Sequence, residues 1–313
     1  AEAYIERTFT SGLELAYEIA ISNYKIKTDW PKSVINEANK LKIEKEENAH
    51  YEDLRDKTFV TIDGKSAKDF DDAVLGEKDG EGNYILYVAI ADVARFVKQG
   101  SVIDQEAAER GTSVYFTQRV VPMLPEIISN DLCSLRPNED RFCLVCKTII
   151  DKDGILKDST FFEAQINSKA RLTYEKLTDE IEQNKLNKIY SKSIKNLLEI
   201  YERLKINKKN RGALELEVPF YVPKFSNNKI IKFISSPRTV AHMMIEEFML
   251  AANIATAELC LKFNMPSLYR VHPKPDLLKI KYLRAFVRNR RINAKLDEGN
   301  SVGQLSKLAE MVE

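Results

Sequence analysis

The fold is decided by Thr58-Phe59-Val60-Thr61-Ile62-Asp63-Gly64-Lys65-Ser66-Ala67-Lys68-Asp69-Phe70-Asp71-Asp72, where the pattern of the chain changes to strand. The first five of these residues are β-branched or aromatic, which predicts a strand. A second apolar run at residues 84–90 predicts another strand, and residues 80–83 supply a turn between the two. The acidic residues are therefore expected in the loop that joins two strands.

Further strands and two helices are predicted downstream of this stretch. The strands are expected at residues 113–116, 142–150 and 160–166, with a turn at residues 151–154. Residues 186–204 repeat apolar side chains at helical spacing, and Gly212 ends that helix. Residues 240–263 predict a helix so apolar that it should be buried. We therefore expect an α+β fold, with a mixed or antiparallel β-sheet core and helices packed around it.

A charged connector divides the chain. Residues 12–22 are apolar, and the Asp-Trp-Pro at residues 29–31 opens a short helix, because proline suits a first helical turn. Residues 42–48 are almost all charged and predict a solvated connector, although a polar helix end fits equally well. We place the domain boundary there, with residues 1–50 as a lead-in segment and linker and residues 51–313 as the main domain.

Composition excludes several classes of protein. Lys and Arg total 48 against 47 Asp and Glu, so any basic surface for a polyanion must be local. The 4 cysteines are too few for a disulfide framework, and no apolar run approaches the roughly 18 to 20 residues that span a bilayer. We expect a cytoplasmic protein without a membrane segment. Because the sequence opens with Ala-Glu-Ala and stops at Glu313 in a helix-like stretch, we expect a piece of a longer protein.

Four carboxylates, those of Asp63, Asp69, Asp71 and Asp72, fall within ten residues. Like charges this close repel strongly unless a cation lies among them. Carboxylates without His or Cys favour Mg²⁺, or Mn²⁺, over Zn²⁺. Such a site suits the metal-assisted hydrolysis of a phosphodiester.

Two other interpretations of the acidic stretch differ in strength. A calcium-binding EF-hand loop counted from Asp69 would need Gly at position 74 and Glu at position 80, where this chain has Val74 and Gly80. That interpretation fails. An ordinary acidic surface loop fits the spacing as well as a metal site does.

Further blocks follow the acidic stretch in a fixed order. They are Thr-Ile-Asp-Gly at 61–64, Asp-Phe-Asp-Asp-Ala-Val at 69–74, Val-Ala-Ile-Ala-Asp-Val at 88–93, Gly-Thr-Ser-Val-Tyr-Phe at 111–116, Val-Pro-Met-Leu-Pro at 121–125, Leu-Cys-Ser-Leu at 132–135, Ala-Arg-Leu-Thr-Tyr at 170–174 and Ile-Glu-Glu-Phe-Met-Leu-Ala-Ala-Asn at 245–253. With these blocks the chain resembles the ribonuclease II/ribonuclease R family over nearly its whole length. Residues 12–31 also resemble the lead-in to a bacterial catalytic domain of that family.

The resemblance implies a fold and an activity. The fold would be the RNB-type catalytic domain. The activity would be that of a processive 3′-to-5′ exoribonuclease, which binds single-stranded RNA 3′ ends and uses Mg²⁺-assisted water attack to release nucleoside 5′-monophosphates. The resemblance makes Asp63, Asp69, Asp71 and Asp72 both the catalytic residues and the metal ligands, and it makes Asp71 indispensable for cleavage.

The resemblance also implies three RNA-binding residues. Tyr115 would clamp the terminal bases, because an aromatic ring stacks on any base. Tyr174 and Glu246 would contact the last nucleotides, where a carboxylate can accept a hydrogen bond from a 2′-OH that DNA lacks. Taken without the family, Tyr115 is expected in the core of a strand and Glu246 as a buried acid paired with Arg238 or Arg270.

The chain departs from the family at several places. Ala-Arg-Phe at 94–96 stands where bacterial members carry a Ser-His-Tyr-like triplet, and Leu216 replaces a Phe. The family's Gly-His-Phe-Gly-like and Ser-Pro-Ile-Arg-Arg-like blocks have no counterpart before Glu313, and neither do the cold-shock and S1 modules. We therefore expect residues 1–313 alone to be inactive or nearly so.

Two other functions are weighed against the exoribonuclease. One is a non-catalytic or truncated RNA-binding relative, which the four intact aspartates argue against. The other is an unrelated magnesium phosphotransferase acting on small molecules, which Tyr115 and Tyr174 argue against.

Weaker candidates for binding residues lie elsewhere in the chain. Cys143 and Cys146 are three residues apart on a strand and face opposite sides, so we expect buried apolar residues and no chelation. His242 and His272 are expected to have their hydrogen bonds satisfied within the fold. A basic helix at residues 277–291 offers a phosphate-facing strip, but a solvated face is favoured. The strip consists of Lys281, Arg284, Arg288, Arg290 and Arg291.

Overall fold

A mixed seven-stranded sheet forms the centre of the computed structural model, which describes residues 8, 12–43, 50–213, 220–227, 229–271, 276–293 and 302–311. The strand order is β1-β8-β7-β4-β3-β2-β9. The strands are β1 (Glu52–Asp53), β2 (Val60–Asp63), β3 (Asp72–Lys78), β4 (Tyr84–Ala91), β7 (Asp140–Ile150), β8 (Leu156–Asn167) and β9 (Ala170–Thr173). Neighbours pair antiparallel except for β1 with β8 and β2 with β9. The expected α+β fold is confirmed.

Helices and two small hairpins complete the fold. The helices are α1 (Gly12–Asn23), α2 (Lys32–Ala38), α3 (Val93–Phe96), α4 (Val102–Arg110), the π-helix η1 (Ile128–Leu132), α5 (Tyr174–Glu182), α6 (Ser191–Asn210), α7 (Val240–Lys262), α8 (Leu277–Asn289) and α9 (Val302–Glu310). The hairpins are β5 (Val114–Tyr115) with β6 (Val120–Val121) and β10 (Tyr221–Ser226) with β11 (Lys229–Ser235). Among the described residues, none of the helices has the length and apolar character needed to cross a bilayer.

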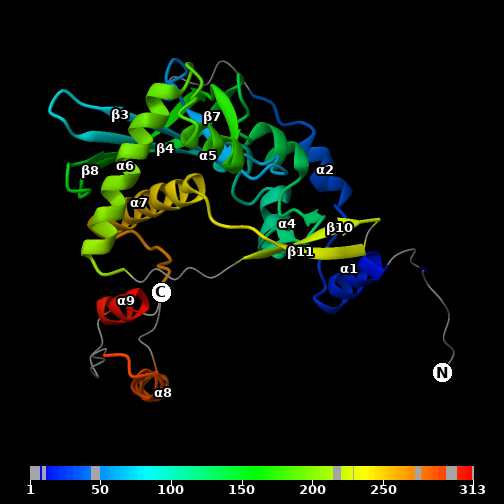
Figure 1. Ribbon diagram of the computed structural model, residues 1–313. Coiled ribbons are helices and arrows are strands. Elements are labelled where there is room, and N and C mark those ends of the chain that lie inside the picture. The colour runs from blue at the N-terminus through cyan, green and yellow to red at the C-terminus, as the bar shows by residue number, and fades with distance from the viewer. Residues whose placement is uncertain are drawn as a thin grey trace, which may run out of the picture.

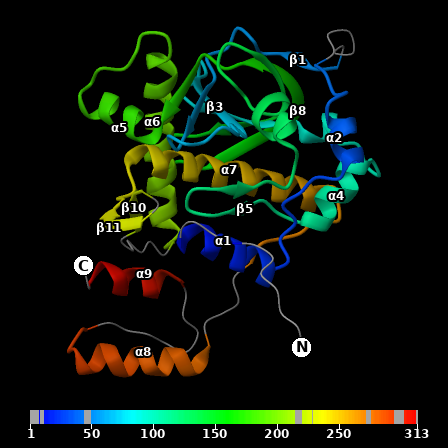
Figure 2. The same cartoon turned by 90° about the vertical axis from the view of Figure 1, so that its right-hand side faces the viewer.

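The sheet is buried on both faces. Along β4, Leu86 and Val88 join one apolar cluster, while Tyr87 and Ala89 join another, because successive side chains on a strand point to opposite faces. Helices α6 and α7 cover the first face, and α2 and α4 lie against the other (Figures 1 and 2). This double burial explains why β4 is almost continuously apolar.

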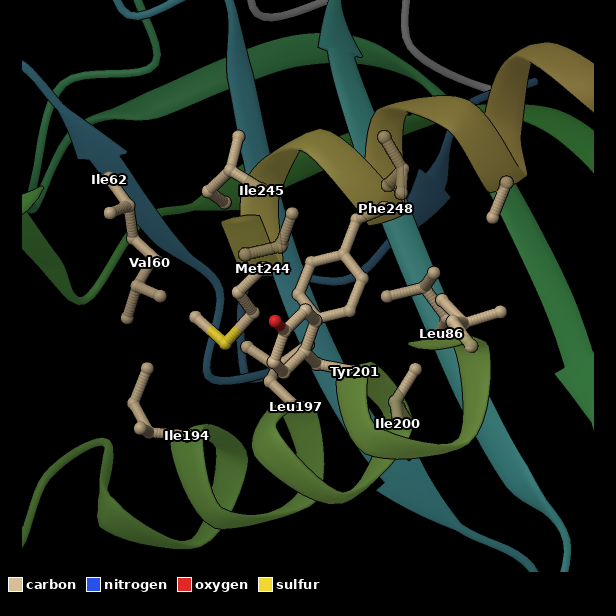
Figure 3. Close-up of a cluster of buried hydrophobic side chains, with 14 of the residues drawn as sticks. Val60, Ile62, Leu86, Ile194, Leu197, Ile200, Tyr201, Met244, Ile245 and Phe248 are labelled. Carbon is tan, nitrogen blue, oxygen red and sulfur yellow. The ribbon is translucent and has the colours of Figure 1, made fainter. Parts of the chain in front are cut away.

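The larger cluster joins α6 and α7 to the strands. Figure 3 shows Leu197 and Tyr201 of α6 and Phe248 of α7 lying between the helices and the sheet, near Leu86. The expectation that α7 is buried all round is wrong, because one side of the helix is open and Leu250 is exposed. A nearly uniform apolar helix does not reveal which of its sides is covered.

Strand β3 is one of the elements that the sequence analysis did not predict, and it is the one that changes the position of the aspartates. It lies between β2 and β4, so the turn at residues 80–83 joins β3 to β4. Charged residues at both ends and Gly76 in the middle weaken its strand signal. As a result, Asp63 ends β2 and Asp72 begins β3, and the expectation that all the aspartates lie in a loop is wrong for these two.

The N-terminal segment packs on the main core, whereas the C-terminal helices do not. Val34 and Ala38 of α2 belong to the second cluster, so the lead-in segment shares a core with the main domain. The connector falls mostly on residues 44–49, outside the described residues, and the domain boundary stays a prediction. Helices α8 and α9 lie apart from the sheet with a small apolar cluster of their own (Figures 1 and 2). The left-handed φ of +68° at Gly212 agrees with its expected role after α6.

Helix α6 covers an edge of β3. Strand β2 pairs with β3 only at Val60 and Val74, which leaves the later backbone of β3 open on that side. Gly76 N donates to Ser193 Oγ at 3.3 Å, and Asn196 Nδ2 donates to Gly76 O at 2.9 Å. These bonds satisfy backbone groups that β2 does not reach.

Gly76→Ala should destabilise this contact. A Cβ at position 76 would lie 2.8 Å from Leu197 N, which is backbone and cannot turn away. We expect the free energy of unfolding to fall by about 1–3 kcal/mol. Urea unfolding measures it, with Gly80→Ala as the control because no atom lies within 4 Å of that Cβ. Equal stability of the two variants would show that α6 does not approach β3 so closely.

Candidate active site

The sheet holds two of the four aspartates. Asp63 lies opposite Thr173 of β9, and Asp72 lies opposite Ile90 of β4. Asp69 and Asp71 belong to the acidic turn, residues 64–71, which connects the two strands. The four residues are therefore gathered where β2 ends and β3 begins. Three of them are half-buried, and Asp71 is exposed.

Burial and neighbouring carboxylates make three of these aspartates harder to ionise. Burial raises the pKa of Asp63 to about 7, and the charges of Asp72, Asp71 and Asp69 add to that rise while Arg171 opposes it. Burial and Asp71 raise the pKa of Asp72 to about 6. Desolvation by the surrounding protein and the charge of Asp69 raise the pKa of Asp71. Asp63, Asp71 and Asp72 are thus less easily ionised than isolated aspartates.

The donor chemistry of this group fits a hard divalent cation. The donors are carboxylate oxygens, which Mg²⁺ and Mn²⁺ prefer. Asp63 Oδ2 is buried and has no hydrogen-bond partner. Among the residues that the structure describes, however, no three His, Cys, Asp or Glu side chains stand close enough together to hold an ion. Binding would therefore require the carboxylate side chains to turn toward one another while the backbone keeps its position.

Tyr115 stands at the acidic turn and is not a core residue. Its side chain is 67% exposed on the β5–β6 hairpin, so the expectation of a buried strand aromatic is wrong. Its hydroxyl donates to Asp69 Oδ2 at 3.4 Å. Together with Lys68, Asp69 and Arg119, it lines a hollow of about 510 Å³. An exposed ring beside the aspartates is available for stacking.

Tyr174 also lies near the aspartates. It is half-buried at the start of α5, where burial together with the charges of Asp63 and Asp72 raises its pKa to about 12. Its ring stacks on His242 with centroids 3.9 Å apart. His242 Nδ1 accepts a hydrogen bond from Thr239 N at 3.3 Å, so this ring nitrogen is satisfied within the fold. The stack with Tyr174 was not foreseen.

Glu246 follows His242 by one turn of α7. It is exposed and forms an ion pair with Arg238. Arg238 was one of the two partners expected from the residues alone, but the expected burial is wrong. The buried acid of this helix is Glu247, which pairs with Lys208 at 2.6 Å. Glu246 is therefore accessible on the same side of the helix as His242.

The other candidates have structural roles or fall outside the described residues. Cys146 belongs to the first apolar cluster and Cys143 to the second, which confirms that they lie on opposite faces of the sheet. The Arg95 guanidinium lies 3.8 Å from the Phe142 ring centroid. His272 and Leu216 lie outside the described residues. In the basic strip on and just after α8, Arg284 is half-buried and the others are exposed, namely Lys281, Arg288, Arg290 and Arg291.

Sequence reasoning missed two side chains that hold the acidic turn. Ser134 and Arg171 each form hydrogen bonds with the backbone of that turn. Both lie in blocks that carry the family resemblance, but their residue types gave no sign of this contact.

Comparison with known proteins identifies the family. The RNB domain model matches residues 51–313. The chain belongs to the RNB domain family. Ribonuclease R of Vibrio parahaemolyticus is 42% identical over 277 residues, which are 86% of this chain and 33% of that protein. This RNB chain therefore spans about a third of the length of that curated relative.

Solved structures of an RNB relative share the fold. Mycoplasma genitalium RNase R in complex with ribose-methylated single-stranded RNA matches with a TM-score of 0.88 and 31% identity, covering 94% of this chain and 47% of that one. The same protein in complex with double-stranded RNA also gives a TM-score of 0.88, with 30% identity, covering 94% of this chain and 54% of that one. The sheet and helices described above are therefore the RNB fold.

Asp63→Asn tests whether the raised pKa of Asp63 makes stability depend on pH. The measurement is made in EDTA so that no divalent ion is bound. The folded-state pKa of Asp63, about 7, lies above the ordinary 3.8. Protonation of Asp63 therefore stabilises the fold fully below about pH 4, and this contribution is lost as the pH rises through about 7. We expect the wild-type free energy of unfolding to fall more steeply across this range than that of the variant, as urea unfolding would measure. Asp56→Asn, at an exposed position, should keep the wild-type slope. Identical slopes for wild type and Asp63→Asn would contradict this account.

Proposed function

We propose that this chain is part of the catalytic domain of a 3′-to-5′ exoribonuclease that hydrolyses single-stranded RNA processively to nucleoside 5′-monophosphates. The observation that carries the proposal is the gathering of the four aspartates beside Tyr115 and Tyr174. The matches to proteins named ribonuclease R, one of them solved with single-stranded RNA, support this class of reaction. We also propose a cytoplasmic location, as the sequence leads us to expect.

The four aspartates are the proposed ligands of Mg²⁺, or of Mn²⁺. When bound, the ion would lower the pKa of the attacking water and offset negative charge at the scissile phosphate. The chain contributes the position of the carboxylates. Asp63 and Asp72 are held by strand pairing, whereas Asp71 is exposed.

The side chains around the aspartates are suited to bind single-stranded RNA of any sequence. The exposed ring of Tyr115 is placed to stack on a base, and stacking favours no particular base. Tyr174 and Glu246 are the proposed contacts to the last nucleotides. The Glu246 carboxylate is exposed and can accept a hydrogen bond from a ribose 2′-OH, although it must then share its charge with Arg238.

Asp71→Asn in the full-length protein tests the proposed reaction. The wild-type protein with Mg²⁺ should shorten a 5′-labelled single-stranded RNA stepwise. The variant should lose more than the roughly 10- to 100-fold of activity that a change next to a metal ligand typically costs, because it loses the ligand itself. RNA binding, measured by filter retention, should remain.

The same assay separates the enzyme from a non-catalytic relative. Asp56→Asn changes an exposed acid away from the acidic turn and should cleave like wild type. Wild-type protein that retains the labelled RNA with Mg²⁺ but never shortens it would instead favour an RNA-binding protein without nuclease activity.

A further inference from the structure

The turn at residues 64–71 lies outside the strand ladder, although it carries Asp69 and Asp71. Strand pairing fixes only its two flanks, at Asp63 and Asp72. Two backbone bonds reach the turn from outside. Ala91 N donates to Asp71 O at 2.9 Å, and Leu135 N donates to Phe70 O at 2.9 Å. The turn is held further by side chains.

The Ser134 hydroxyl bridges the two residues that flank Asp69. Phe70 N donates to Ser134 Oγ at 3.0 Å, and Ser134 Oγ donates to Lys68 O at 3.0 Å. Ser134 is fully buried, so water does not replace these bonds. A hydroxyl can accept and donate at once, whereas the methyl group of alanine can do neither. The hydroxyl therefore fixes the backbone on both sides of one carboxylate.

A buried guanidinium holds Ser134 in place. Arg141 Nε donates to Ser134 O at 3.0 Å, and its side chain is 5% exposed. The same group forms ion pairs with Asp131 at 3.2 Å and with Glu139. The segment that carries Ser134 is thus fixed independently of the acidic turn.

Arg171 holds the opposite end of the turn. Its Nη2 donates to Gly64 O at 2.7 Å and to Lys65 O at 3.0 Å. Its guanidinium lies 5.5 Å from the centroid of the Phe70 ring. Arg171 belongs to β9, the strand that pairs with β2. One side chain thus connects the first two residues of the turn to the edge strand of the sheet.

We propose that Ser134 and Arg171 are positioning residues that hold the acidic turn in the shape required for divalent-cation binding. This inference rests on the proposed function, because it assigns a role around the same aspartates. Neither side chain needs to touch substrate. They act on the backbone that presents Asp69 and Asp71, as outer-shell partners do in other metal sites.

Ser134→Ala in the full-length protein is the main test. We expect Mn²⁺ affinity, measured by electron paramagnetic resonance, and kcat on single-stranded RNA each to fall about 10- to 100-fold. KM for RNA should stay at the wild-type value, because the proposed RNA contacts Tyr115, Tyr174 and Glu246 are unchanged. Arg171→Lys is the second variant. It keeps the positive charge but loses the rigid, planar guanidinium whose Nη2 donates to both carbonyl groups, so the same two quantities should fall.

Ser193→Ala is the matched control. Ser193 is also buried and its Oγ also accepts from a strand N–H, that of Gly76, but it lies on α6 away from the acidic turn. Its loss should lower the melting temperature while leaving Mn²⁺ affinity and kcat at the wild-type values. A structural effect alone would therefore appear in both serine variants.

The results distinguish this inference from the proposed function. Ser134→Ala with the Mn²⁺ affinity and kcat of Ser193→Ala would overturn the positioning role, and if Ser134→Ala does not fold, Arg171→Lys decides in the same way. Wild-type protein that binds Mn²⁺ but does not cleave RNA would count against the proposed function, and the Mn²⁺ affinities of the variants would still decide the positioning role. Wild-type protein that binds no Mn²⁺ would overturn the positioning role.

Discussion

The mutual repulsion of four carboxylates at the junction of β2 and β3 is the constraint on which the site depends. Two of them, Asp63 and Asp72, are fixed by strand pairing, and burial raises the pKa of both. A sheet with both faces covered provides the rigidity that such crowding requires, because close-packed interiors resist displacement. The apolar clusters around α6 and α7 therefore serve the geometry of the acidic turn as well as stability.

Much of the fold could be predicted from local patterns. Strands β4 and β7 are long and mostly apolar, so the sequence alone predicted them. It also predicted the second half of β8 and the end of α6 at Gly212. Strand β3 was missed because its position depends on pairing with β2 and β4, and its own residues give a weak signal. Which side of α7 is buried also depends on tertiary packing, which an almost uniformly apolar helix does not encode.

The sequence likewise predicted part of the candidate site and missed the rest. The aspartates were found because their spacing is unusual for charged residues, and the family resemblance singled out Tyr115, Tyr174 and Glu246. What the sequence could not provide was the environment of each group: the exposure of Tyr115, the stacking of Tyr174 on His242, and the contacts of Ser134 and Arg171 with backbone carbonyl groups. A hydrogen bond from a side chain to backbone far away in the sequence requires no particular residue type at the other end, so the sequence alone did not predict these contacts.

The central claim is that a divalent ion joins the carboxylates at the junction of β2 and β3. Anomalous diffraction from a crystal soaked in Mn²⁺ tests it most directly. The account predicts an anomalous peak among Asp63, Asp69, Asp71 and Asp72, with carboxylate oxygens turned inward to distances of about 2.1 Å, as for Mg²⁺. A map without a peak there, in which the same side chains point outward into bulk solvent, would contradict it.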